Sequence, residues 1–258
     1  MPRTDWGWLI TPEELRSWTI LEDDGILVVN KPAHVLCHRA KHGAWSSLIA
    51  ACRDLTAIDR LHMPSRLDRE TSGVVLFTKT RAALDAVNRA ARRTGAIAKT
   101  YHAILTGSLQ APVAVDQPIG MAQNSIVAIR RAVTPEGRPA RTEFVPIASV
   151  AGHTLVRVTP VTGRTHQIRV HAQWLGHPVL GDKIYGPDER LFVEFLQTGW
   201  TPRLREILTL ERHALHCSEF RLEDRRFSAP LPLELSAMLS QTPDLARLTG
   251  SHETNPPD

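Results

Sequence analysis

The 258-residue sequence predicts an α+β protein with a mainly antiparallel mixed sheet core and flanking helices and loops. Three observations lead to this class: short β-rich runs occur in clusters, only a few helical segments interrupt them, and no long-period repeat is present. A hydrophobic share of 42% and a charged share of 22% are typical of a globular domain with a real core. No apolar run approaches the ~18 residues that a membrane helix needs.

The first part of the chain, residues 1–19, is predicted to be an arm attached to the main domain. Thr11, Pro12 and Glu14 are typical of a helix start, with Thr as N-cap, Pro at the first helical position and Glu completing a capping box. Leu15 and Trp18 would dock this short helix on the body. Residues 20–240 would form the main domain, and the polar residues 241–258 are expected to be a frayed tail.

Within the main domain, hydrophobic periodicity and turn residues place the elements. Apolar or alternating runs predict strands at 26–29, 74–78, 100–105, 142–150 and 154–160. Helical patterns predict helices at 80–93, 165–175, 203–212 and 233–239. Six Pro and Gly residues between 108 and 140 indicate loops and short antiparallel pieces.

The charge balance narrows the class of partner. The formal net charge is +4, and 26 of the 31 basic residues are arginines. The planar guanidinium suits phosphates and bases, so this composition favours a nucleic acid, although a GC-rich genome produces the same bias. The first residues contain no signal peptide, so we expect a cytoplasmic protein with no membrane partner.

Metal binding is not expected. The three cysteines are widely spaced and form no C-x-x-C pair, which argues against a disulfide framework and a structural zinc site. His34, His38 and His42 are spaced by four, as on one face of a helix. A proline lies just before them and no H-E-x-x-H motif is present, so ordinary surface histidines are the simpler interpretation.

Two stretches contain a candidate acid and a candidate aromatic residue. The sequence S-R-L-D-R-E-T-S-G at 65–73 places Asp68 between Arg66 and Arg69. Nearby cations favour the ionised carboxylate, which can act as a nucleophile or a base. An Asx turn leading into the next strand explains the same residues. K-T-Y-H-A at 99–103 contains Tyr101, which a strand can place either in the core or in a site.

A third stretch, G-R-T-H-Q-I-R-V-H at 163–171, concentrates positive charge at a predicted helix start. Arg164, His166 and Arg169 would lie near the free backbone N–H groups of the first turn, which favours an anion site. A helix with a charged outer face is the alternative.

Together, these stretches resemble the RluA family of RNA pseudouridine synthases. The family motif around the catalytic acid is H-R-L-D-x-x-T-S-G, and the chain also contains K-x-Y-x-A, G-R-T-H-Q-I-R-x-H and, at 176–186, G-H-P-x-x-G-D-x-x-Y-G. An early N-K-P at 30–32 and a late L-H at 215–216 also match. The order and spacing agree from about residue 20 to residue 240, which a chance match does not explain.

The resemblance implies a pseudouridine synthase catalytic domain over 20–240. Such an enzyme isomerises uridine to pseudouridine at specific sites in structured rRNA or tRNA, without a metal, nucleotide or redox cofactor. The uridine is flipped out of its strand into a pocket. Asp68 corresponds to the catalytic acid, which attacks C1′, adds to the base or removes the 2′ proton. We expect a monomer, and the sequence leaves the target uridine open.

The resemblance also implies roles for the substrate-binding residues. Arg164 would pair with Asp68 and keep its carboxylate ionised. Tyr101 would stack on the flipped uracil and help to remove its C5 proton. Arg66 would fill the gap that the flipped nucleotide leaves. Contacts to phosphate or to the pocket wall are expected of Lys99, His166 and Arg169.

Two positions depart from the family pattern. Ser65 replaces the usual His before R-L-D, which affects supporting hydrogen bonds rather than the catalytic acid. His34 stands where the family usually has Gly, which would alter a turn. No S4-type RNA-binding domain is evident before residue 20, so RNA docking would rest on the catalytic domain and the arm.

Two other functions compete with the enzyme. An RNA-binding or ribosome-assembly factor of the same fold would lack the reaction, and the presence of Asp68, Tyr101 and Arg164 argues against it. An N-glycoside hydrolase would use Asp68 on a free nucleoside and release uracil. The Arg-rich composition and Arg66 favour a polymeric substrate instead.

Overall fold

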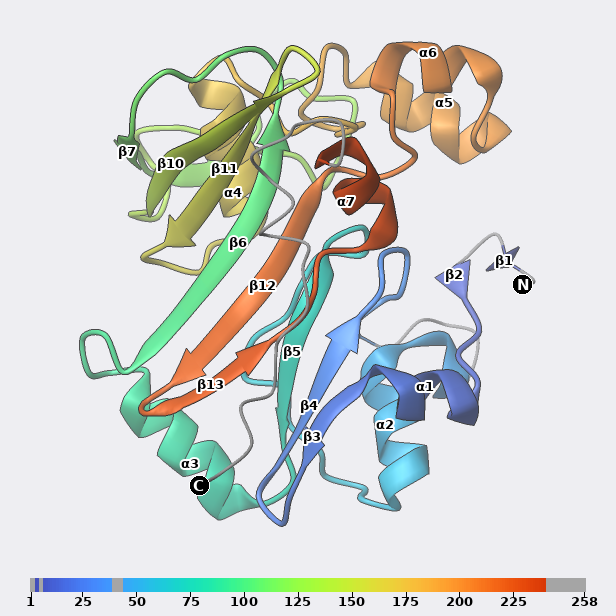
Figure 1. Cartoon of the computed structure of the whole chain (residues 1–258), viewed down its shortest axis with the longest axis vertical. Coiled ribbons are helices and arrows are strands. Elements are labelled where there is room, and N and C mark those ends of the chain that lie inside the picture. Colours follow the sequence, from blue (N-terminus) through green and yellow to red (C-terminus); the bar gives the residue numbers. More distant parts are fainter. Residues whose placement is uncertain (1–2, 5–6, 39–43, 240–258) are drawn as a thin grey trace.

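The computed structural model describes residues 3–4, 7–38 and 44–239, and a mixed sheet forms the core of this part of the chain (Figure 1). The strands are β1 (Arg3–Thr4), β2 (Gly7–Trp8), β3 (Thr19–Glu22), β4 (Ile26–Lys31), β5 (Ser72–Thr78), β6 (Ile97–Leu105), β7 (Val113–Asp116), β8 (Ile119–Met121), β9 (Arg131–Val133), β10 (Arg141–Val150), β11 (His153–Pro160), β12 (Leu215–Leu222) and β13 (Arg225–Ser228). The large sheet has nine strands in the order β3-β4-β5-β12-β6-β11-β10-β7, with β13 paired to β12. The pairs β1-β2 and β8-β9 form separate small sheets.

Among the described strands of the large sheet, only β5 and β12 run parallel, and all other neighbours are antiparallel. This parallel pair joins the two halves of the sheet. Gly73 of β5 has a φ of +115°, and a Cβ atom there would lie 2.1 Å from the carbonyl oxygen of Cys217 on β12. Only glycine permits this approach. The predicted α+β class with a mainly antiparallel sheet is confirmed.

The described part of the chain has seven α-helices around the sheet. They are α1 (Pro12–Trp18), α2 (Leu48–Thr56), α3 (Arg81–Ala90), α4 (Gln167–Trp174), α5 (Arg190–Thr198), α6 (Pro202–Leu208) and α7 (Leu233–Leu239), with a 3₁₀ turn at Ala44–Ser46. Helices α1 and α2 lie beside β3 and β4 (Figure 1). Helix α3 lies at one end of the molecule, and α4, α5 and α6 lie at the other.

Helix α1 begins as the sequence predicts. The Thr11 hydroxyl accepts a hydrogen bond from the backbone N–H of Glu14, and the Glu14 carboxylate accepts one from the N–H of Thr11 at 2.9 Å. Leu15 is fully buried in the main hydrophobic core, and Trp18 packs partly buried against it. The predicted docking of this helix is therefore confirmed. The tail predicted at 241–258 lies outside the described residues.

Helix α4 is shorter than the predicted helix at 165–175. His166 precedes it with a φ of 58°, in the left-handed region. The cause is Gln167, whose Oε1 accepts hydrogen bonds from the Thr162 hydroxyl at 2.7 Å and the Arg164 N–H at 3.0 Å. Its Nε2 donates to the Thr142 hydroxyl of β10 at 2.9 Å. One buried amide thus ties the turn before the helix to the sheet.

The sequence patterns did not predict α2, α5, β12 and β13, nor the short strands β1, β2 and β3. Helix α5 is rich in aromatic and branched residues, so its local preference is ambiguous. It is stabilised by packing, because Leu191 forms a small core with Leu204 and Leu208 of α6. In β12, a bulge between Cys217 and Glu219 breaks the alternation that identifies a strand.

His216 ties β12 to the start of β5 at the centre of the sheet. Its Nε2 donates to the carbonyl of Ala229 at 3.1 Å, and its Nδ1 accepts from the Ser72 hydroxyl at 2.9 Å. Because a carbonyl can only accept, Nε2 carries a proton. Burial lowers the pKa of His216 to about 4.

We expect the free energy of unfolding to fall as the pH is lowered from 6.5 to 4. The unfolded chain protonates His216 near pH 6.5, whereas the folded chain resists protonation down to about pH 4. Over this window the unfolded state gains about 1.4 kcal/mol per pH unit from this residue. Urea unfolding at closely spaced pH values measures the decline. It should be shallower in His216→Gln, and equal slopes in the two proteins would contradict the assignment.

Candidate active site

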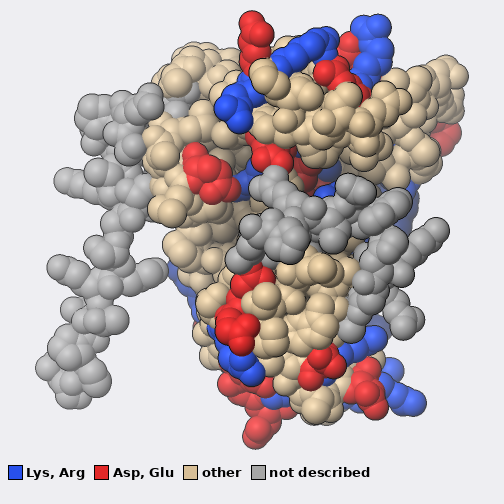
Figure 2. Space-filling model, turned by 90° about the vertical axis from the view of Figure 1, so that its right-hand side faces the viewer, with Lys and Arg blue, Asp and Glu red and all other residues tan. Residues whose placement is uncertain are grey.

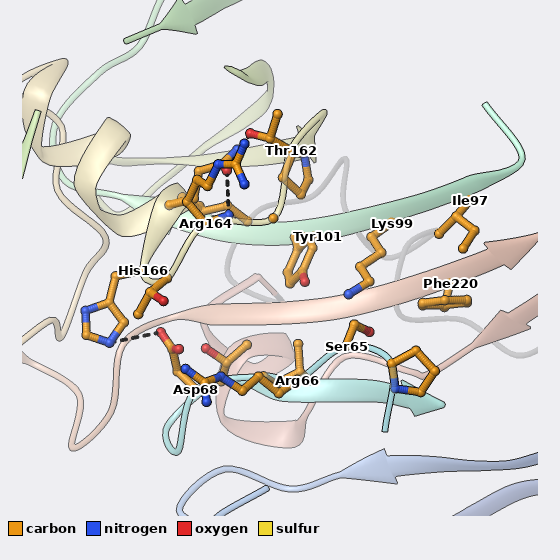
Figure 3. A pocket seen from close by; sticks show the side chains of 18 of the residues that line it. Ser65, Arg66, Asp68, Ile97, Lys99, Tyr101, Thr162, Arg164, His166 and Phe220 are labelled. Carbon is orange, nitrogen blue, oxygen red and sulfur yellow. Dashed lines mark hydrogen bonds and ion pairs between the residues drawn. The ribbon is translucent and has the colours of Figure 1, made fainter. Parts of the chain in front are cut away.

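A cleft of about 660 Å³ opens over β6 and β12, between the loop before β5 and the turn before α4. This volume is ordinary for a ligand-binding site. The site residues predicted from the sequence all line this cleft, and they are Arg66, Asp68, Lys99, Tyr101, Arg164, His166 and Arg169. Figure 3 shows Asp68 and His166 at one end, and Tyr101 and Lys99 further along.

Asp68 lies on the loop that leads into β5. The N–H of Thr71 donates to the carbonyl of Asp68 at 3.2 Å and closes a turn. The buried ammonium of Lys31 donates to the carbonyl of Arg69 at 3.1 Å and to two carbonyls of its own segment. The loop is therefore fixed to the strand beside it. The Asp68 side chain is 27% exposed, and its Oδ1 accepts no hydrogen bond from the described residues.

Arg169, in the first turn of α4, is the partner of Asp68. Its Nη1 donates to Asp68 Oδ2 at 2.9 Å, while its Nε and Nη2 donate to Asp182 at 2.6 and 2.9 Å. Burial opposes the charge of the guanidinium, but Asp182 and Asp68 outweigh it and raise the pKa of Arg169. Asp182 is fully buried, and burial alone would raise its pKa, but Arg169 and two backbone N–H groups lower it. The result is a buried cation with one carboxylate on each side.

The predicted pairing of Arg164 with Asp68 is wrong. The Nε of Arg164 donates instead to the carbonyl of Pro139 at 2.9 Å. Arg164 belongs to the turn held by Gln167, outside the helix, whereas Arg169 lies on the buried part of α4. Arg164 still lines the cleft, and its two terminal nitrogens form no hydrogen bond or ion pair with the described residues.

His166 lies 3.9 Å from Asp68, measured from its Nε2 to Asp68 Oδ2. Its Nδ1 is 2.8 Å from the hydroxyl of Tyr185, which accepts the N–H of Arg131 at 2.8 Å. In the tautomer in which that hydroxyl donates to Nδ1, the ring proton sits on Nε2, on the side of Asp68. Burial and the neighbouring Arg169 lower the pKa of His166 to about 4. The ring is neutral at pH 7 and offers the acid a hydrogen-bond donor without a charge.

Tyr101 and Lys99 point to the same side of β6, because they are two residues apart. Tyr101 is 7% exposed and lies opposite Cys217 of β12. Burial raises the pKa of Tyr101 well above its ordinary value, so it is a neutral phenol at pH 7. Arg66 is exposed and forms no hydrogen bond or ion pair with the described residues.

The two departures from the family pattern have different outcomes. His34 adopts a φ of 68°, the left-handed conformation that glycine favours, so the turn is kept at a cost of about 1–2 kcal/mol. Ser65 lines the cleft and forms no hydrogen bond with the other described residues. Ser65 therefore does not replace the supporting hydrogen bonds that the family histidine would make at this position.

Sequence reasoning assigned no role to Asp182, Tyr185, Glu70 or Lys183. Asp182 hydrogen-bonds to Arg169 and Tyr185 to His166, and Lys183 Nζ donates to Glu70 on the loop that carries Asp68 at 2.8 Å. The signal was present, because three of the four belong to the G-D-K-I-Y-G segment at 181–186. A motif shows that residues matter, but not which of them contact each other.

Neither a metal cluster nor a membrane span is found in the described residues. No group of three or more His, Cys, Asp or Glu in these ranges is arranged to hold a metal ion, and His42 lies outside them. None of the helices in the described ranges is long and apolar enough to cross a bilayer.

An aspartate in an open cleft, set on a mixed sheet and backed by a buried arginine, is what the resemblance to RNA pseudouridine synthases leads us to expect. The family model described as RNA pseudouridylate synthase matches residues 25–174. The chain therefore belongs to the RNA pseudouridylate synthase family, which confirms the resemblance seen in its motifs. It is an enzyme of the isomerase class that converts uridine to pseudouridine in RNA.

Individual relatives agree. Ribosomal large subunit pseudouridine synthase D of Vibrio parahaemolyticus is 34% identical over 230 residues, which cover 85% of this chain and 68% of the relative. Ribosomal large subunit pseudouridine synthase C of Escherichia coli is 41% identical over 174 residues, or 66% of this chain and 53% of the relative. The chain thus spans about half to two thirds of these relatives. The structure of human RNA Pseudouridylate Synthase Domain Containing 1 matches with a TM-score of 0.64 and 25% identity, covering 93% of this chain and 96% of that one.

Removal of Arg169 should destabilise the fold far more than removal of Arg164. Arg169→Met leaves Asp182 buried without its cation, and breaking a buried pair costs about 3–5 kcal/mol. Arg164→Met removes the same charge but only one hydrogen bond near the surface, worth about 1 kcal/mol. Urea unfolding of the two variants tests the difference, and equal losses of stability would refute the central role of Arg169.

Proposed function

We propose that this chain modifies uridine in the RNA of the large ribosomal subunit, with Asp68 as its catalytic residue. The choice of rRNA rests on the relatives, which are named as ribosomal large subunit enzymes. The catalytic role rests on one observation: the Asp68 carboxylate lies in an open cleft, with Oδ2 held by Arg169 and Oδ1 accepting no hydrogen bond from the residues that the structure describes.

The chemistry that this carboxylate would serve needs no cofactor. The N1–C1′ bond breaks, the uracil turns, and C5 bonds to C1′. The proton lost from C5 balances the proton gained by N1. Attack on C1′, addition to the base and removal of the 2′ proton all begin from the carboxylate form of Asp68, and the guanidinium of Arg169 donates a hydrogen bond to this group at 2.9 Å.

Entry of the uridine requires its extrusion from the strand, at a cost of a few kcal/mol. Arg66 is exposed at the mouth of the cleft, and we assign it to the position that the flipped nucleotide vacates. The ring of Tyr101 offers a stacking face. Because its pKa is raised, we assign its hydroxyl to hydrogen bonding with the uracil rather than to removal of the C5 proton. His166 would orient Asp68 or the uracil through its Nε2 proton.

The RNA backbone would follow the cations at the cleft. The terminal nitrogens of Arg164 and the ammonium of Lys99 form no hydrogen bond or ion pair with the described residues, so they are available to phosphates. On the face drawn in Figure 2, Lys and Arg side chains are interspersed with Asp and Glu, and the visible part of it offers no continuous basic track. One chain supplies Asp68, Tyr101 and Arg169, so a monomer would suffice. We place the protein in the cytoplasm because its relatives are named as ribosomal large subunit enzymes.

A pseudouridine map of rRNA and tRNA from cells with and without the gene tests the function. A site that disappears on deletion and returns with the wild-type gene identifies the target. Its presence in large-subunit rRNA would support the proposal, and its presence in tRNA would overturn the choice of RNA. An unchanged map of both would count against the activity and favour a silent RNA-binding factor.

Asp68→Asn should fold and bind RNA but form no pseudouridine. The amide keeps the shape of the side chain and removes the charge on which each route depends. The measurement is single-turnover conversion of the mapped RNA, with the wild-type protein as control. Measurable turnover by the variant would exclude Asp68 as the catalytic residue.

Tyr101→Phe should lose most of its turnover while its affinity for RNA stays within about threefold. The substitution keeps the stacking ring and removes only the hydroxyl, whose hydrogen bond would be made to the flipped base. Turnover and RNA affinity are measured on the same RNA. Normal turnover would leave Tyr101 with a packing role.

A further inference from the structure

The cleft extends well beyond the catalytic acid. Ile97, Lys99 and Tyr101 are every second residue of β6, so their side chains line the same side of the strand. Ile97 is four residues from Tyr101, which is about 13 Å along the strand. Figure 3 shows Asp68 at one end of the cleft and Ile97 and Phe220 at the other. We call the Ile97 end the distal lobe.

The distal lobe has an apolar floor and one polar side chain at its rim. Phe220 of β12 and Val87 of α3 are 2% and 3% exposed, and Ile97 is partly buried beside them. Asn88 and Ala91 stand exposed at its rim, at the end of α3. The Asn88 amide forms no hydrogen bond with the described residues, so both its donor and its acceptor are available. An apolar slot with an amide at its edge suits a planar heterocycle.

Lys99 lies between the distal lobe and the catalytic end. Its ammonium is 5.4 Å from the centre of the Phe220 ring and has no hydrogen-bond or ion-pair partner among the described residues. By contrast, the ammonium of the buried Lys31 donates to three backbone carbonyls. Burial lowers the pKa of Lys99, and no carboxylate among the described residues forms an ion pair with its ammonium.

We propose that the distal lobe binds the unpaired nucleotide next to the isomerised uridine, with the ammonium of Lys99 on a phosphate between the two. The proposal rests on the proposed function, because it assumes that a uridine of an RNA strand enters at Asp68. It names the substrate class: loops or bulges with at least two consecutive unpaired nucleotides, rather than a single flipped base in a continuous helix.

The first test changes the RNA and uses the Asp68→Asn protein, so that binding is measured without turnover. The probe is a hairpin with a loop of uridines on a stem of G–C pairs. Its partner carries abasic nucleotides at alternate loop positions, which leaves uridines to flip but no base beside them. We expect about tenfold weaker binding of the alternating loop. Equal affinities would overturn the proposal, whereas the pseudouridine map would be unaffected by this outcome.

The second test fills the distal lobe. Ala91→Trp places a bulky ring at its rim, and Ala82→Trp makes the same change at an exposed position of α3 that does not line the cleft. In the Asp68→Asn background, Ala91→Trp should lose about tenfold in affinity for the uridine loop and no longer distinguish the two loops. Ala82→Trp should behave like its parent. Equal behaviour of the two tryptophan variants would refute the lobe, and the RNA test holds even if Ala91→Trp does not fold.

The third test concerns the phosphate. Lys99→Met in the same background should reduce the slope of log affinity against log salt by about 0.7, the value for one phosphate contact on a single strand. An unchanged slope would show that Lys99 does not contact a phosphate and would overturn that part of the proposal.

Discussion

One buried cation holds the site together. Arg169 is surrounded by protein, and such a charge is tolerated only when it is paired and fully hydrogen-bonded. Asp182 supplies most of this compensation, because its carboxylate accepts two hydrogen bonds from Arg169. The same carboxylate accepts two more from backbone N–H groups. The remaining nitrogen of Arg169 reaches Asp68. The fold therefore presents a fixed positive charge to the acid, and helix α4, the loop before β5 and the 181–186 segment meet at this point.

The loop that carries Asp68 is held residue by residue. Lys31 holds the carbonyl of residue 69, and Glu70 accepts a hydrogen bond from Lys183. The Thr71 hydroxyl is 2.7 Å from a ring nitrogen of His213. The close approach of β5 to β12 then fixes the strand that follows. Such support is what a functional side chain needs in order to keep one geometry.

Much of the fold and of the site could be predicted from the sequence, because the signals were local. Capping residues identified α1, and alternation identified β6. The motifs indicated that Asp68, Tyr101 and Arg169 share one site, and all three line the cleft. The choice of the arginine that pairs with Asp68 was wrong, because it depends on where α4 begins. That boundary is set by hydrogen bonds of Gln167 to β10, and no local pattern encodes such a contact between distant segments.

The two carboxylates beside Arg169, Asp182 and Asp68, differ in how much the fold depends on them. Asp182 accepts two of the three hydrogen bonds that the Arg169 side chain donates, so the fold does not rely on the carboxylate at position 68. A descendant of this gene that lost that carboxylate would inherit an intact cleft and its hold on RNA. This arrangement opens an evolutionary path on which a modifying enzyme becomes a chaperone by one amino-acid replacement.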